Sequence, residues 1–126
     1  MKEIKKIKID PDIHFRMLNT LHENPSVTQR EIALKLGISL GGVNYCLKSL
    51  IIIGHIKIKN FQTNPNKLTY LYLLTPIGMK EKTLLTADFL KRKMSEYNAL
   101  KFEIETIKSS FNKKVLKDLN LKNDSD

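Results

Sequence analysis

Residues 28–54 of the chain, TQREIALKLGISLGGVNYCLKSLIIIG, decide the expected fold. Thr28 and Glu31 have the spacing of a capping box, in which each side chain binds the backbone N–H group of the other residue, so a helix is expected to begin there. Gly37 lies where this helix must end, since the left-handed conformation of a helix end costs glycine little. Ser39 has the position of a second N-cap. Two capped helices with a tight turn between them indicate a helix-turn-helix, whose second helix can enter the major groove of DNA.

The neighbouring segments extend this helical pattern. Asp10 and Pro11 provide an N-cap and a favourable first helical residue, and Asn24 with Pro25 ends that first helix. Gly54 ends the second helix of the helix-turn-helix. The residues expected in the core recur at helical spacing: Ile13, Met17, Leu18, Leu21, Ile32, Ala33, Leu36, Val43, Leu47, Leu50 and Ile51.

A β-hairpin is expected directly after these helices. Residues 55–61, HIKIKNF, alternate apolar and basic side chains, which is typical of a strand with one solvated face. Residues 68–75, LTYLYLLT, form a second β-rich run, and residues 63–67, TNPNK, are expected to form the loop between the strands. A hairpin in this position is the wing of a winged helix.

A long helix is expected to follow the hairpin. Thr75 and Pro76 repeat the signal of a cap followed by proline. The apolar residues are spaced 4, 3, 3, 4, 3 and 4, which is typical of a coiled-coil seam: Leu90, Met94, Tyr97, Leu100, Ile104, Ile107 and Phe111. From Pro76 to Phe111 this helix would extend about 50 Å, too far for a winged helix to cover. A second short helix, with Val115, Leu116 and Leu119, is expected before a frayed polar end.

The predicted fold is therefore mainly α with a small β-hairpin. A winged helix-turn-helix DNA-binding domain is expected in residues 1–75, and a dimerisation helix with a short polar tail in residues 76–126. The apolar seam could meet a second copy of the chain, another protein, or the same helix folded back after a break. We expect a second copy, because most oligomers are symmetric homodimers.

The charge of the chain favours a polyanionic partner. The 126 residues carry a formal net charge of +9, from 22 basic and 13 acidic residues. Residues 1–75 hold 11 basic and 5 acidic groups, so two thirds of the excess lies with the predicted winged helix. Nucleic acid or an anionic membrane surface would fit this excess, and Lys-rich and Ile-rich composition also arises in AT-rich genomes. No apolar signal segment and no membrane-length run is seen, so a cytoplasmic protein without membrane contact is expected.

The side of residues 40–53 opposite the apolar residues is the expected DNA-reading face. Asn44 could bind adenine through two hydrogen bonds, and Tyr45 could contact a base edge or a phosphate. Lys48 would reach the DNA backbone, while Gly41 and Gly42 let backbone N–H groups approach a phosphate. The alternative is an ordinary solvated helix face. The expected DNA contacts also include the start of the preceding helix and the wing: Thr28, Gln29, Arg30, Ser39, Gly41, Gly42, Asn44, Tyr45, Lys48, Lys57, Lys59, Asn64, Asn66 and Lys67.

The predicted contacts of the helix start and of the wing each have an alternative interpretation without DNA. The polar residues at the helix start and the lysines of the wing also suit an ordinary first turn and an ordinary charged hairpin. If the lysines contact phosphates, each contact adds about 0.9 to the salt dependence of binding.

The sequence offers no constellation for catalysis or metal binding. His14, His22 and His55 have no metal-ligand spacing with one another or with carboxylates. No phosphate-binding glycine loop, nucleophile elbow or carboxylate pair occurs, so neither an enzyme nor a cofactor is expected. Cys46, the single cysteine, lies beside the apolar side of its helix and is expected to be a small buried thiol rather than a redox switch.

The order of elements and several short motifs resemble the MarR family of bacterial transcription regulators, most closely a small branch linked to exopolysaccharide gene clusters. The motifs, within residues 11–108, are TQRE at 28–31, GISLG at 37–41, VNYCLK at 43–48, NKL at 66–68, YLLTP at 72–76, FLKRK at 89–93 and EY at 96–97. The resemblance implies a dimeric winged-helix repressor or activator bound to a promoter. It also implies that Leu40–Ile53 is the reading helix and that residues 63–67 form the wing tip.

Two features depart from the family pattern. Larger MarR proteins have a long N-terminal helix that completes the dimer domain and helps to form an effector pocket. Only ten residues precede the first helix here, which argues against a small-molecule effector. Gly42 stands where close relatives are expected to carry a basic residue, so one contact to the DNA backbone is expected to be weakened or redirected.

The sequence therefore predicts a homodimeric regulator that reads double-stranded DNA. Two reading helices in successive major grooves imply a near-palindromic site with half-sites about one helical turn apart. The alternative comes from another class of protein: a winged-helix adaptor that reads no DNA and joins a larger assembly through its long helix. Such an adaptor would be retained on DNA only weakly and without regard to sequence.

Overall fold

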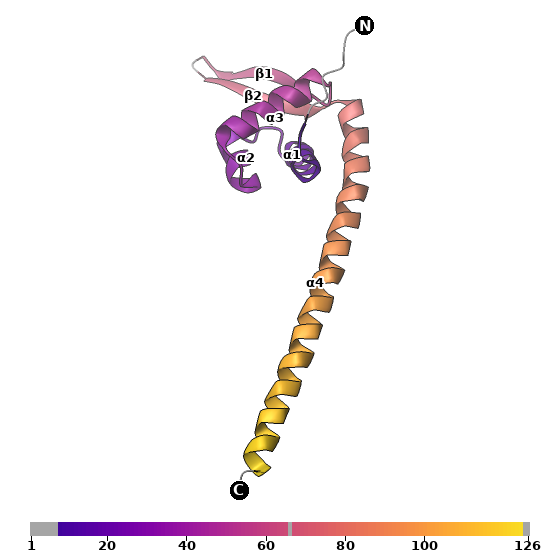
Figure 1. Cartoon of the computed structure of the whole chain (residues 1–126). Helices are drawn as coiled ribbons and strands as arrows, with labels where there is room; N and C mark the ends of the chain where they lie inside the picture. Colours follow the sequence, from indigo (N-terminus) through magenta and orange to yellow (C-terminus); the bar gives the residue numbers. More distant parts are fainter. Residues whose placement is uncertain (1–7, 66, 125–126) are drawn as a thin grey trace. The chain divides into compact units, whose positions relative to one another are not determined.

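The computed structural model describes residues 8–65 and 67–124, with the side chains of residues 61, 63–64, 67–68 and 121–124 outside that description. Figure 1 shows three short helices and a two-stranded hairpin followed by one long helix. The elements are α1 (Pro11–Glu23), α2 (Gln29–Leu36), α3 (Leu40–Ile52), β1 (Ile56–Asn64), β2 (Lys67–Leu74) and α4 (Pro76–Asp124). This order confirms the predicted fold class, mainly α with a small antiparallel hairpin.

The helix ends of the helix-turn-helix lie where the sequence predicts them. The hydroxyl oxygen of Thr28 accepts a hydrogen bond from the backbone N–H of Glu31 at 3.1 Å and donates one to its carboxylate at 3.0 Å. Ser39 Oγ accepts from the backbone N–H of Gly42 at 3.0 Å and so begins α3. Gly37 and Gly54 follow the two helices with φ angles of +69° and +77°, a conformation that any side chain would make unfavourable.

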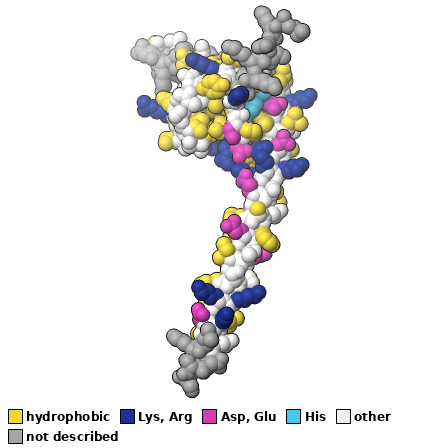
Figure 2. Space-filling model, viewed as in Figure 1, with side chains coloured by type: hydrophobic (Ala, Val, Ile, Leu, Met, Phe, Trp, Pro, Cys, Tyr) yellow, Lys and Arg dark blue, Asp and Glu magenta, His cyan; other side chains and the backbone are white. Residues whose placement is uncertain are grey.

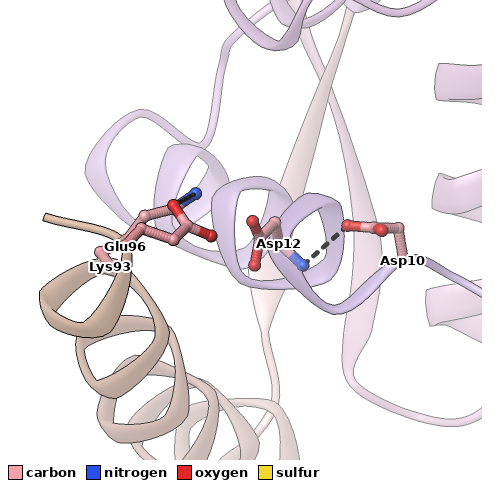
Figure 3. A network of polar contacts seen from close by, with 4 residues as sticks. All are labelled: Asp10, Asp12, Lys93 and Glu96. Atoms are coloured by element: carbon pink, nitrogen blue, oxygen red, sulfur yellow. Dashed lines mark hydrogen bonds and ion pairs between the residues drawn. The ribbon is translucent and has the colours of Figure 1, made fainter. Parts of the chain in front are cut away.

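The first helix begins as predicted. Asp10 Oδ1 accepts hydrogen bonds from the backbone N–H groups of Asp12 at 2.9 Å and Ile13 at 3.2 Å, and Figure 3 shows the first of these bonds. Pro11 occupies the first helical position, where a missing N–H group costs no helical hydrogen bond. Asn24 ends α1 and returns its own N–H to the carbonyl of Thr20 at 3.0 Å.

The hairpin has longer strands than the sequence suggested. The predicted loop over residues 63–67 is wrong, because β1 continues to Asn64 and β2 begins at Lys67. Continued pairing satisfies backbone N–H and C=O groups that a loop would leave to water. Pro65 lies at the turn, where its carbonyl accepts a hydrogen bond from the Gln62 side chain at 3.0 Å. Asn66 lies outside the described residues.

One core joins the three short helices to the base of the hairpin. Its buried hydrophobic residues are Met17, Leu18, Leu21, Val27, Ile32, Val43, Cys46, Leu47, Leu50, Ile56 and Tyr72. Four residues that were expected in the core are only partly buried against it: Ile13, Ala33, Leu36 and Ile51. They lie at the margins of their helices' apolar faces, where neighbouring elements cover one side only.

The long helix α4 takes part in two compact units. Its first turns, up to Phe89, belong to the unit that holds the winged helix, where Leu85 packs against the core. The Phe89 ring stacks on Phe15 with centroids 4.4 Å apart. The predicted domain boundary after residue 75 stays a prediction. The second unit begins at Leu90 and is helical as far as Asp124.

The second unit corrects one expectation. The separate short helix expected near Val115 is wrong, because α4 continues through this segment without a break. Every residue from 101 to 119 permits this, since the stretch contains neither proline nor glycine, the residues that most disfavour a helix. Lys93 and Glu96 form an ion pair of 3.1 Å along this helix (Figure 3).

Candidate nucleic-acid interface

The predicted reading face of α3 is exposed on its outer side. Asn44, Tyr45 and Lys48 are exposed, and Tyr45 keeps 54% of its surface accessible. On the opposite side, Val43 and Leu47 are buried in the core. The buried side fixes the helix to the domain, so the exposed side is a polar surface on a rigid element.

The first turn of α3 has no side chains beyond Leu40 until Val43. A Cβ atom on Gly41 would meet nothing closer than Ser39 Oγ at 4.0 Å, so this position is open. A Cβ atom on Gly42 would lie 3.2 Å from the same oxygen, so a larger residue there requires the cap to shift slightly. The exposed backbone of this turn is therefore most accessible at Gly41.

Substituting Gly41→Ala separates stability from DNA contact. Alanine fits the open position and raises the free energy of unfolding by up to about 1 kcal/mol, because it restricts the unfolded chain. The added methyl group also holds a phosphate away from the first-turn N–H groups, so we expect weaker DNA binding. Thermal unfolding and fluorescence anisotropy on a labelled duplex measure the two effects. Unchanged affinity in the stabilised variant would show that DNA does not approach this turn.

The start of α2 combines capping with an exposed cation. The Thr28 hydroxyl is already engaged in the capping box, where it donates to the Glu31 carboxylate and accepts from the Glu31 N–H. Gln29 is partly buried, and its side-chain amide donates a hydrogen bond to the Tyr72 hydroxyl at 3.3 Å. Arg30 is exposed. Of these three predicted contacts, Arg30 has the freest access to a phosphate.

The wing presents its lysines on one face. Lys57 and Lys59 are exposed on β1 and alternate with Ile56 and Ile58. Ile56 is buried, whereas Ile58 is 45% exposed because the hairpin extends beyond the core there. The side chains of Asn64 and Lys67, and the whole of Asn66, lie outside the described residues, so their predicted contacts stay predictions.

Tyr72 is a residue of this region that the sequence analysis missed. Its ring is buried, its N–H donates to the Pro25 carbonyl at 3.0 Å, and its hydroxyl accepts from Gln29. It therefore ties β2 to the segment that leads into α2. The alternation in LTYLYLLT contained a signal, because it places Tyr70 and Tyr72 on one face of the strand. A hollow of about 540 Å³, lined in part by both rings, lies between this face and the start of α2.

The cysteine and histidines do not form a metal centre in the described part of the chain, where no group of three or more metal-ligating side chains comes together. Cys46 is buried, as expected, and burial raises the pKa of its thiol. A raised pKa disfavours the reactive thiolate, which agrees with a packing role. Within the described residues, no helix is both long and apolar enough to cross a membrane.

The apolar seam of α4 is uncovered in the single chain. Figure 2 shows hydrophobic side chains at the surface along this helix, interspersed with charged ones. The seven predicted seam residues keep 46–64% of their surface accessible: Leu90, Met94, Tyr97, Leu100, Ile104, Ile107 and Phe111. Leu116 and Leu119 are also exposed farther along the same continuous helix.

Comparison with known proteins agrees with the geometry of the winged helix. Residues 10–56 match a family described as winged helix-turn-helix DNA-binding. Among solved structures, a variant of ZitR from Lactococcus lactis shares 26% sequence identity over 79% of this chain and 65% of ZitR, with a TM-score of 0.56. FabT from Streptococcus pneumoniae, solved in complex with DNA, shares 21% identity over 75% of this chain and 62% of FabT, with a TM-score of 0.53.

A third structure with a similar fold comes from the MarR family. AdcR, a zinc-dependent MarR-family transcriptional regulator, shares 18% identity over 79% of this chain and 65% of AdcR, with a TM-score of 0.53. No curated protein matches the chain. The chain thus spans slightly less than two thirds of the length of ZitR, FabT and AdcR. It contains a winged helix-turn-helix domain, and AdcR, a MarR-family regulator, has a similar fold.

Proposed function

We propose that the protein is a homodimeric transcriptional regulator that binds double-stranded DNA in a sequence-specific manner through the exposed face of α3. The observation that carries this proposal is the two-sided character of α3. Its apolar side is buried, and its polar side, with Asn44, Tyr45 and Lys48, is exposed. An exposed helix in the second position of a helix-turn-helix has the geometry for major-groove contact.

The wing and the start of α2 supply the phosphate contacts in this proposal. Lys57 and Lys59 are exposed cations beside the reading helix in the chain order of a winged helix, and Arg30 adds a third. Contacts to phosphate set the position of a protein on the duplex, whereas contacts to base edges select the sequence. The match of residues 10–56 to a winged helix-turn-helix DNA-binding family, and the similar fold of FabT, which was solved with DNA, support DNA binding by this domain.

In this proposal, the long helix α4 joins two copies of the chain, so that the dimer has two DNA-binding α3 helices. The seven seam residues of α4 remain exposed in one chain, and such a seam is stabilised when a second helix covers it. Two copies then present two α3 helices to one duplex, and we propose a near-palindromic operator. The resemblance to the exopolysaccharide-linked branch of the MarR family makes surface-polysaccharide genes our proposed targets.

The experiment that tests this function compares sequence preference rather than affinity alone. A preferred duplex is selected from random DNA with the wild-type protein, and binding to it and to a scrambled duplex is measured at two salt concentrations. Asn44→Ala combined with Tyr45→Ala should reduce the preference by at least about tenfold, since each good base contact contributes about 1–3 kcal/mol of discrimination. The salt-dependent binding to the scrambled duplex should persist, because the phosphate contacts remain.

Leu34→Ala is the matched control, because Leu34 is 85% exposed on α2 and belongs to no predicted contact. This variant should keep the wild-type preference, and circular dichroism should show that all variants are folded. An unchanged preference in the Asn44/Tyr45 variant would contradict the assignment of the reading helix. Wild-type protein that retains no sequence preference at either salt concentration would favour the adaptor instead.

A further inference from the structure

Two histidines that are distant in the sequence meet at the base of the wing. His14 lies on α1, and His55 lies in the turn between α3 and β1. Nε2 of His14 is 3.2 Å from Nδ1 of His55, and the two rings stack with centroids 5.2 Å apart and planes inclined by 16°. Neither the DNA-reading face nor the dimer seam uses this pair.

The backbone of His55 connects several elements. Its N–H donates to the Leu50 carbonyl of α3 at 2.9 Å, and its carbonyl accepts from the Thr75 N–H at 3.0 Å, at the junction of β2 and α4. The next residue, Ile56, begins β1 and is buried. A displacement of His55 would therefore move the base of the wing relative to α3 and the start of α4.

The contact between the two imidazole rings depends on how many of them are protonated. When both rings are neutral, or when one is protonated, one nitrogen can donate and the other can accept. When both are protonated, both nitrogens carry hydrogen, the bond is lost and two positive charges face each other. Burial lowers the pKa of His14, and the charge of His55 lowers it further. Burial also lowers the pKa of His55.

Glu81 of α4 is the opposing charge. Its carboxylate raises the pKa of both histidines, but this effect is smaller than that of burial, so both pKa values stay below 6.5. The groups that meet here are thus His14 from α1, His55 from the α3–β1 turn and Glu81 from α4. Well above pH 6.5 the folded protein and the unfolded chain both hold neutral rings. As pH falls below that value, the unfolded chain gains protons first, so stability decreases.

We propose that the His14–His55 pair is a proton-sensitive clasp that holds the base of the wing to α1 and opens on acidification, with loss of DNA affinity. The loss of affinity rests on the proposed DNA-binding function, whereas the opening of the clasp does not. The expected direction of the change in DNA affinity distinguishes this proposal from a simple charge effect. Protonation of histidines adds positive charge, which by itself strengthens attraction to DNA, so weaker binding at low pH requires a structural change.

The test uses a pair of substitutions that keep the hydrogen bond without the titration. His14→Gln places an amide N–H near the position of Nε2, and His55→Asn places a carbonyl oxygen near the position of Nδ1. His22→Gln is the control, because it removes another histidine of α1 outside the pair. Thermal unfolding and affinity for the selected duplex are measured at about pH 7.5 and about pH 5.5, where histidine titrates.

Wild type and His22→Gln should both bind the selected duplex about tenfold more weakly at the lower pH, and their melting temperatures should fall. The double variant should keep its melting temperature and affinity nearly constant. NMR titration should place the ring transitions of His14 and His55 below pH 6.5. Equal pH dependence in wild type and the double variant, or ring transitions at or above that value, would overturn the clasp.

The two proposals can fail separately. If the protein binds no DNA sequence-specifically at neutral pH, the proposed function fails, and the melting and NMR measurements still decide the clasp. If the rings titrate as expected and the melting temperature falls but affinity does not, the clasp opens without controlling DNA binding, and the regulatory part of the proposal is wrong.

Discussion

Gly78→Val is expected to produce a large loss of stability in the winged-helix unit. A Cβ atom on Gly78 would lie 1.9 Å from the carbonyl oxygen and 2.8 Å from the carbonyl carbon of His55. Both are backbone atoms of the tight turn after α3, so no side-chain rotation relieves the clash. The first turn of α4 must instead move away from that turn.

This movement would break hydrogen bonds as well as packing. The Thr75 N–H donates to the His55 carbonyl at 3.0 Å, and the Thr75 hydroxyl donates to the carbonyl of Gly54. The same hydroxyl accepts from the Gly78 N–H at 3.0 Å as the N-cap of α4. We expect a loss of about 3 kcal/mol, at the upper end of the usual cost of overpacking, and a melting temperature lower by roughly 10 °C or more.

Gly41→Ala is the control for Gly78→Val and for the milder Gly78→Ala. Gly41 also lies in the first turn of a helix, but the space around it is open. Alanine should therefore stabilise the protein at Gly41 and destabilise it at Gly78. Differential scanning calorimetry measures both effects, and a Gly78→Ala variant as stable as wild type would contradict the close packing of α4 on His55.

Ile104→Glu is expected to have the largest effect on DNA binding. Ile104 lies in the middle of the seam and is 46% exposed in the single chain. In a dimer, the substitution places two carboxylates in an apolar interface, where unpaired charges are unfavourable. Dissociation of the dimer leaves each chain with only one DNA-binding α3 helix. The loss of two-site binding should lower operator affinity by about 100-fold.

Phe102→Glu is the matched control on the same helix. At 100° per residue, Phe102 lies nearly opposite Ile104, and it is 72% exposed. Like Ile104→Glu, the Phe102→Glu substitution replaces a large hydrophobic side chain by a carboxylate, but at a position outside the seam. Sedimentation should give twice the 14.6 kDa chain mass for wild type and Phe102→Glu, and the chain mass for Ile104→Glu. A dimeric Ile104→Glu protein, or dissociation by Phe102→Glu, would contradict the assigned seam.

Local signals in the sequence were sufficient to predict the helix ends and the fold class. The caps at Asp10, Thr28 and Ser39 and the left-handed glycine at position 37 depend on residues close in the chain, and the structure confirms them. The apolar periodicity likewise predicted most of the core. The strand ends were less predictable, because TNPNK is typical of a loop while pairing with β2 extends β1 to Asn64.

Contacts between distant residues escaped the sequence analysis. His14 and His55 are 41 positions apart, and Gln29 and Tyr72 are 43 apart, so no local pattern connects either pair. Gly78 follows the predicted cap of α4 and has no unusual φ angle, so only the neighbouring backbone of His55 explains why glycine is needed there. For the reading face, periodicity predicted which side of α3 is exposed, but it could not predict that Tyr72 holds Gln29.

The central claim is that DNA contacts the exposed side of α3, and NMR mapping tests it most directly. Isotope-labelled wild-type protein is titrated with the selected duplex, and shifts of backbone amide signals are followed residue by residue. We expect the largest shifts at Gly41, Asn44, Tyr45 and Lys48 of α3, with smaller shifts at the wing lysines. Largest shifts on α1 or along the seam of α4, with the signals of α3 unchanged, would contradict the account.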